Sequence, residues 1–139
     1  MNQERILLVD DEPAVLEALR LRLGRDYDIY TSSSPEEALE LIIEKEPFPV
    51  IMSDLRMPYM NGIEFLQEAQ KLSPQSSTIL LTGQGEFDSA VEALNSGVIF
   101  KYLSKPCERV EIGNALAEGI KIFKRKSKNK IALKEHSKE

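Results

Sequence analysis

The sequence predicts a doubly wound α/β domain, in which a five-stranded parallel sheet is covered by helices on both faces. Three observations predict it. Five short apolar runs alternate along the chain with segments of helical pattern, which is the rhythm of strands joined by helices. Three of the runs are nearly continuous hydrophobics, as in central strands that are buried on both faces. Helix start and stop signals flank the segments between the runs.

The strands are expected where the apolar runs lie. Tyr27–Tyr30 alternates between apolar and polar residues, which suits an edge strand with one exposed face. The runs with continuous hydrophobic character are the first, third and fourth. In chain order, the five predicted strands are Arg5–Val9, Tyr27–Tyr30, Val50–Ser53, Ser77–Leu81 and Ile99–Leu103.

Local signals set the limits of the first two helices. Pro13 is placed to open the first helix, and Gly24 is placed to end it. Ser34 and Glu37, with proline between them at the first helical position, predict a capping box at the start of the second helix.

The last three helices have comparable signals. The third ends before Pro74, and Gly97 closes the fourth. The fifth begins near Glu108 and keeps an apolar stripe as far as Phe123. Five such strand–helix units make one doubly wound domain with right-handed crossovers.

Composition excludes several classes of protein. With 42% hydrophobic and 29% charged residues, the chain is neither disordered nor collagen-like. No apolar run approaches the roughly 20 residues of a membrane span, and the start lacks a secretory signal pattern. Cys107 is the only cysteine, which excludes an internal disulfide and favours a reducing, cytoplasmic setting. The only histidine, His136, lies near the end, so chemistry that needs a buried histidine base is disfavoured.

Charge divides the chain into an acidic body and a basic tail. Residues 1–120 carry 10 Lys and Arg against 21 Asp and Glu, a net charge of −11, whereas residues 121–139 carry +6. A positive charge confined to the tail is not the footprint of a nucleic-acid-binding domain. We therefore interpret residues 124–139 as a solvated helical extension or linker, with no membrane or direct nucleic-acid binding.

Polar residues follow the buried runs, where parallel strands end at one edge of the sheet. Open α/β sheets bind their ligands at this carboxyl edge. Three carboxylates, hydroxyl groups and an ammonium group are therefore expected to converge, although they are scattered along the sequence. They belong to Asp10, Asp11, Asp54, Thr82, Ser104 and Lys105.

Three neighbouring carboxylates raise one another's pKa unless a cation compensates them. A ligand set made only of oxygens indicates a hard divalent ion, and few protein ligands favour Mg²⁺ over a Ca²⁺ cage. Lys105 and Thr82 would help this ion to hold the oxygens of a phosphoryl group. A carboxylate within such a clamp can act as the nucleophile and form an aspartyl phosphate.

These residues resemble the receiver domain of bacterial two-component response regulators. The resemblance rests on Asp10-Asp11, on Asp54 with the following Leu55–Pro58 and Asn61-Gly62, on Thr82-Gly83, and on Tyr102 with Lys105-Pro106, and it covers about Arg5 to Phe123. It implies a flavodoxin-like strand order 2-1-3-4-5, with the receiver domain over residues 1–123 and an extended last helix.

The resemblance also implies roles for single residues. Asp54 looks like the phospho-acceptor, and Lys105 like the lysine that contacts the phosphoryl group, with a cis bond to Pro106. Mg²⁺ would be held by Asp10, Asp11, Asp54 and the backbone carbonyl of Arg56.

Two further pairs of residues would govern the signal and its lifetime. Thr82 and Tyr102 match the switch residues that alter the face made by the fourth helix, the fifth strand and the fifth helix. Arg56 and Gln84 border the phosphoryl pocket, and we expect them to tune phosphoryl lifetime. Asn61 stands where aspartate is frequent in the family, and either residue can cap a helix.

The expected function is signal relay, in which a histidine kinase or phosphotransfer protein donates the phosphoryl group. The chain would then be no enzyme, apart from catalysing its own phosphotransfer and dephosphorylation. Two alternatives stay open, an aspartate-nucleophile phosphohydrolase and an unphosphorylated binding module. The phosphohydrolase is disfavoured because Arg56 occupies the place of its second aspartate. An output domain after the tail and a homodimer are both compatible with the sequence.

Overall fold

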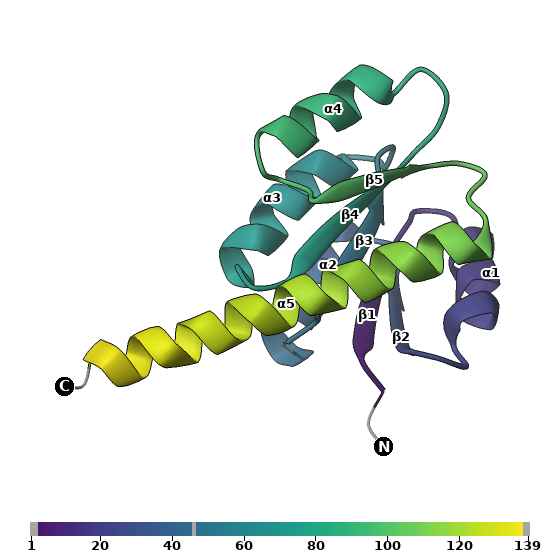
Figure 1. Cartoon of the computed structure of the whole chain (residues 1–139). Coiled ribbons are helices and arrows are strands. Elements are labelled where there is room, and N and C mark those ends of the chain that lie inside the picture. Colours follow the sequence, from purple (N-terminus) through teal and green to yellow (C-terminus); the bar gives the residue numbers. More distant parts are fainter. Residues whose placement is uncertain (1–2, 46, 138–139) are drawn as a thin grey trace.

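Five parallel strands form one sheet, as the sequence predicts, in the order β2-β1-β3-β4-β5 that the family resemblance implies (Figure 1). The computed structural model describes residues 3–45 and 47–137. Residues 1–2 and 46 of the predicted receiver domain (1–123) and residues 138–139 of the predicted extension (124–139) lie outside the described part, as does the side chain of His136. The elements are β1 (Arg5–Val9), α1 (Pro13–Leu23), β2 (Asp28–Ser32), α2 (Pro35–Lys45), β3 (Val50–Asp54), α3 (Gly62–Leu72), β4 (Ser77–Thr82), α4 (Phe87–Asn95), β5 (Lys101–Ser104) and α5 (Arg109–Ser137).

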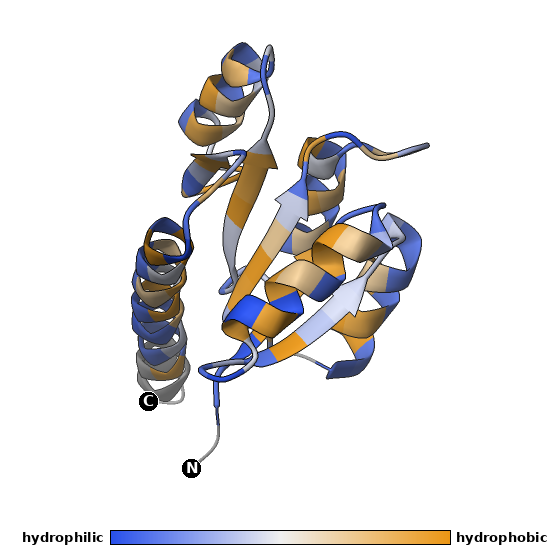
Figure 2. Ribbon diagram, turned by 90° about the vertical axis from the view of Figure 1, so that its right-hand side faces the viewer, coloured by the Kyte–Doolittle hydropathy of each residue, from blue (hydrophilic) through white to orange (hydrophobic). Residues whose placement is uncertain are grey.

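Helices cover both faces of the sheet, with α1 and α5 on one face and α2, α3 and α4 on the other (Figures 1 and 2). Successive strand residues point to opposite faces and therefore join different cores. In β1, Leu7 and Val9 pack with α2, α3 and α4, whereas Ile6 and Leu8 pack with α1 and α5. All residues of β3 and β4 are buried, which explains their continuous hydrophobic runs.

Two strands begin later than the sequence predicts. The amide of Tyr27 donates to the carbonyl of Leu23 in a turn, so β2 starts at Asp28 and runs on to Ser32. Ile99, predicted as the first residue of the fifth strand, precedes β5 and is 2% exposed. Its side chain belongs to the core on the α2, α3 and α4 face of the sheet, and apolar character alone does not separate such a buried loop residue from a strand residue.

The helix caps also differ in part from prediction. Ser34 Oγ accepts from the amide of Glu37 at 3.4 Å, but the amide of Ser34 donates to Ser32 Oγ instead of to Glu37. The predicted reciprocal box is therefore only half formed. A complete box lies at α3, where Asn61 Oδ1 accepts from the Glu64 amide and Glu64 Oε1 accepts from the Asn61 amide.

Helix α5 continues well past the sheet (Figure 1). Its first half packs closely, since Gly119 is buried and its carbonyl accepts a hydrogen bond from Ser77 Oγ at 2.6 Å. Beyond Phe123 the basic residues as far as Lys130 are exposed, with Lys124 Nζ 3.2 Å from Glu4 Oε1. Within the described residues, no helix combines the length and hydrophobicity needed to cross a membrane.

Candidate functional site

An acidic rim lies at the carboxyl edge of the sheet. Val9 pairs with Ser53, so the residues that follow them, Asp10 and Asp54, lie next to each other at the ends of β1 and β3. The carboxylates of Asp10, Asp11 and Glu12 lie within 4.8 Å of one another. Both Asp10 and Asp54 are buried. Two of the three predicted carboxylates therefore meet below the surface, with Asp11 more exposed beside them.

Lys105 reaches into this rim from the loop after β5. Its Nζ lies 2.7 Å from Asp54 Oδ1 and 3.7 Å from Asp10 Oδ2. Its amide donates to the Thr82 carbonyl at 2.7 Å, and its bond to Pro106 is cis, as the family resemblance implies. Burial acts to lower the pKa of Lys105, but the hydrogen bond and the charge of Asp54, followed by the charge of Asp10, raise it overall. Lys105 is therefore a fixed cation at the centre of the site.

Asp10 is the least satisfied group of the site. Its Oδ1 accepts from the Glu12 amide at 2.9 Å. Its Oδ2 is buried and has no hydrogen-bond partner among the described residues. Burial raises the pKa of Asp10, and the charge of Asp54 adds to the shift, against the lowering effects of the Glu12 amide and Lys105. A buried carboxylate oxygen in this state needs a further cation, because isolated buried charge is costly.

The predicted switch residues lie beside the rim but point elsewhere. Thr82, the last residue of β4, is buried, and its Oγ1 donates to the Leu103 carbonyl at 3.3 Å. Tyr102 in β5 is half-buried and packs edge-on against Phe87 of α4, with ring centroids 5.8 Å apart. Phe87 is 61% exposed, which leaves an apolar edge on the face made by α4 and β5.

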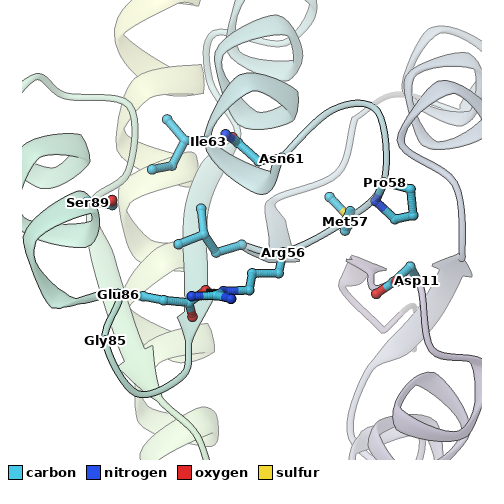
Figure 3. A pocket seen from close by; sticks show the side chains of 10 residues that line it. Asp11, Arg56, Met57, Pro58, Asn61, Ile63, Gly85, Glu86 and Ser89 are labelled. Atoms are coloured by element: carbon cyan, nitrogen blue, oxygen red, sulfur yellow. Dashed lines mark hydrogen bonds and ion pairs between the residues drawn. The ribbon is translucent and has the colours of Figure 1, made fainter.

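Arg56 and Gln84 border a hollow of about 350 Å³ that also contains Asp54 and Lys105 in its lining. Gln84 is exposed. Arg56 extends toward Glu86 and binds its Oε2 through Nε (Figure 3). Two carboxylates in the same lining are not among the predicted site residues: Glu86, which is 6% exposed, and Glu12. Glu86 directly precedes the helical pattern of α4, but its side chain caps no amide of that helix and accepts from the Gly83 amide instead, so its place in the sequence did not signal its role.

The loop after β3 is held by the start of α3. The amide of Gly62 donates to the Leu55 carbonyl at 2.7 Å. A Cβ atom at Gly62 would lie only 2.1 Å from the carbonyl oxygen of Asp54. Glycine is therefore required for α3 to approach the backbone of Asp54, and the Asn61 cap fixes the first turn beside it.

Fold and site together define an α/β domain with a charged rim at the switch point of its strand order, where such sheets place their sites. Residues 6–117 match the family model of the response regulator receiver domain. The chain belongs to this family.

Curated relatives are regulators of greater length. The chain is 32% identical over 123 residues to the response regulator protein PilR of Pseudomonas aeruginosa, covering 88% of this chain and 27% of PilR. It is 36% identical over 116 residues to the transcriptional regulatory protein GlrR of Escherichia coli, covering 83% of this chain and 26% of GlrR. The chain thus spans about a quarter of the length of these relatives.

Solved structures share the fold, and one of those named below is a receiver domain. A structure described as adenylate cyclase from Rhodopirellula baltica has a TM-score of 0.92 and 42% identity, covering 96% of this chain and 98% of that one. A response regulator receiver domain protein from Clostridium thermocellum has a TM-score of 0.81 and 32% identity, covering 85% and 94%.

Proposed function

We propose that this receiver domain relays a signal by accepting a phosphoryl group on Asp54 from a histidine kinase or a phosphotransfer protein. The observation that carries the proposal is the position of Lys105 Nζ, 2.7 Å from Asp54 Oδ1 and 3.7 Å from Asp10 Oδ2. This cation lies where a phosphoryl group on Asp54 would place its oxygens, within an acidic hollow that is open to a donor.

The proposed transfer uses Asp54 as the nucleophile. One carboxylate oxygen forms a bond to phosphorus while the bond from phosphorus to the donor's imidazole nitrogen breaks, and its electron pair stays on nitrogen. Water later attacks the phosphorus, the bond to Asp54 breaks, and inorganic phosphate leaves. Lys105 contributes by stabilising charge on the phosphoryl oxygens, since phosphoryl transfer depends on positioning and electrostatics.

The acidic rim fits a magnesium ion. Asp10 Oδ2 is buried without a hydrogen-bond partner in the described part of the chain. The neighbouring atoms that could bind a metal are carboxylate oxygens, which suits this hard ion. Asp10, Asp11, Asp54 and the carbonyl of Arg56 would hold it. When bound, Mg²⁺ would neutralise charge on the oxygens of the transferring group.

Thr82 and Tyr102 would convert the new charge into a changed surface. A phosphoryl group offers oxygens that compete with the Leu103 carbonyl for the Thr82 hydroxyl. Movement of Thr82 would make room for Tyr102, which lies against Phe87 at the edge of α4. The altered face of α4, β5 and α5 would then engage a partner, as in other two-state switches that a single charge biases.

The longer relatives suggest where the signal goes. Two of them are regulators of which this chain spans about a quarter. An output domain joined beyond α5 would receive the change, and dimerisation through the switching face or through α5 would be one route.

Intact mass spectrometry tests the function. Incubation with acetyl phosphate and Mg²⁺ is expected to add one phosphate to the wild type and none to Asp54→Asn. Lys105→Arg serves as a second variant that keeps the positive charge but changes its geometry, and it should accept the phosphoryl group more slowly. Equal labelling of the wild type and Asp54→Asn would refute the proposal, and sustained hydrolysis of phosphate esters would favour the phosphohydrolase alternative.

A further inference from the structure

A buried carboxylate links the two loops that flank the phospho-acceptor. Glu86, the residue before α4, is 6% exposed. One of its oxygens accepts a hydrogen bond from the amide of Gly83, and the other accepts one from Arg56 Nε. Figure 3 shows the Arg56 and Glu86 side chains extended toward each other from the loops after β3 and β4. Glu86 therefore ties the end of β4 to the loop that follows Asp54.

Both groups that bind Glu86 are donors suited to an anion. A backbone amide and a guanidinium group are standard phosphate ligands, and the guanidinium is charged throughout the physiological range. Gly83 and Arg56 line the same hollow as Asp54 and Lys105. In the unphosphorylated protein, their anionic partner is Glu86.

The contacts of Glu86 are those of a carboxylate. Its two oxygens accept from the Gly83 amide and from the Arg56 guanidinium group, and a guanidinium group pairs with an anion. An ionised Glu86 would repel a phosphoryl group that enters the same hollow, and the phosphoryl oxygens would attract the two donors that Glu86 holds.

We propose that Glu86 is an internal competitor of the phosphoryl group, so that phosphorylation of Asp54 draws Arg56 and the Gly83 amide away from Glu86 and frees the start of α4. This inference rests on the proposed function of Asp54. It adds a second connection from the site to α4, separate from the path through Thr82 and Tyr102. Coupling of this kind is reciprocal. If a phosphoryl group at the site weakens the Glu86 contacts, then loss of those contacts must raise the affinity of the site for the phosphoryl group by the same factor.

Binding of beryllofluoride, a mimic of the phosphoryl group, measures this competition. In the presence of Mg²⁺, Glu86→Ala is expected to bind the mimic about fivefold or more tightly than the wild type does, in the usual range of coupling between sites. Glu86→Gln keeps an acceptor for the Gly83 amide but loses the charge that holds Arg56. Its affinity for beryllofluoride should therefore lie between those of the wild type and Glu86→Ala. Thermal unfolding of both variants identifies any loss of fold.

The matched control is Asp88→Asn. Asp88 lies in the first turn of α4, two positions from Glu86, and is exposed. Its neutralisation removes the same charge from the same end of the helix without breaking the Glu86 contacts, and it should change binding by less than about twofold because exposed charges are screened.

The Arg56 Nε–H signal in a nitrogen–proton correlation spectrum gives a second readout. Beryllofluoride should shift this signal in the wild type, and in Glu86→Gln the signal should start away from its wild-type position. Two results together would overturn the inference and leave the proposed function standing. The Glu86 variants would bind beryllofluoride no more tightly than Asp88→Asn does, and beryllofluoride would leave the Arg56 signal unmoved. A wild type that neither accepts the phosphoryl group nor binds the mimic would overturn both.

Discussion

Two glycines of α5 differ in their surroundings and therefore predict opposite effects of the same substitution. A Cβ atom at Gly119 would lie 2.9 Å from Val50 Cγ2, 3.2 Å from Ser77 Cβ and 3.3 Å from Phe100 Cε1. These separations are shorter than the roughly 3.5–4.0 Å of a favourable carbon contact. A Cβ atom at Gly113 would have no neighbour within 4 Å.

The expected magnitudes follow from these distances. Replacing glycine by alanine inside a helix gains about 1 kcal/mol of intrinsic stability, so Gly113→Ala should stabilise the domain by about that amount. Gly119→Ala gains the same term but incurs about 1–3 kcal/mol of overpacking, so its net effect is between neutral and about 2 kcal/mol of destabilisation. The two variants should differ by about 1–3 kcal/mol in the free energy of unfolding, since their helix terms cancel.

Urea denaturation followed by circular dichroism measures the difference, provided that the m-value stays constant. In a double-mutant cycle, Gly119→Ala should cost less stability in the Val50→Ala background than in the wild type, because the methyl group that the new Cβ would meet first is absent. If Gly113→Ala and Gly119→Ala changed stability equally, the close packing of α5 on β3 and β4 would be refuted.

Three further predictions concern the loop after β3 and the cysteine. Asn61→Ala should cost about 1 kcal/mol of stability through loss of the α3 cap, whereas Asn61→Asp should leave urea unfolding nearly unchanged; equal losses in both would contradict the role of this side chain. Gly62→Ala should cost about 3 kcal/mol or more, because the new Cβ would collide with a backbone carbonyl that cannot rotate away; a stability equal to wild type by thermal unfolding would contradict this. Burial, followed by the charge of Glu111, raises the pKa of Cys107 to about 11, so at pH 8 its thiolate fraction is about 100-fold below that of a thiol with a pKa near 9. Alkylation by iodoacetamide should be correspondingly slow at pH 8 and accelerate as the pH rises toward 11, and a rate at pH 8 equal to that of a free thiol would show this environment to be wrong.

The sheet and the acidic rim could be predicted because each depends on a pattern local to one segment. Continuous apolar runs identify β1, β3 and β4, and a parallel sheet brings the residues after them to one edge. Element limits were harder to predict where an apolar residue has two uses. Ile99 is a buried core residue in the segment before β5, and its hydrophobicity would be the same inside a strand.

Contacts between side chains from distant loops could not be predicted from the sequence. Arg56 was placed near the phosphoryl pocket, yet its partner Glu86 lies 30 positions away in another loop. The capping sequence at Ser34 showed the opposite difficulty. A suitable motif is present, but the Ser34 amide donates its hydrogen bond to Ser32 Oγ instead of to Glu37, so the capping box is only half formed. In both cases the partner is set by which groups lie close in three dimensions, which the sequence alone does not show.

Locating the modified residue tests the central claim most directly. After incubation with acetyl phosphate and Mg²⁺, treatment with hydroxylamine converts an acyl phosphate to a stable hydroxamate, and peptide mass spectrometry then identifies the position. We predict a single hydroxamate at Asp54, the carboxylate that lies nearest to Lys105, 2.7 Å from its Nζ. A hydroxamate on Asp10, Asp11 or a carboxylate outside the rim, or none at all in a folded protein, would contradict the account.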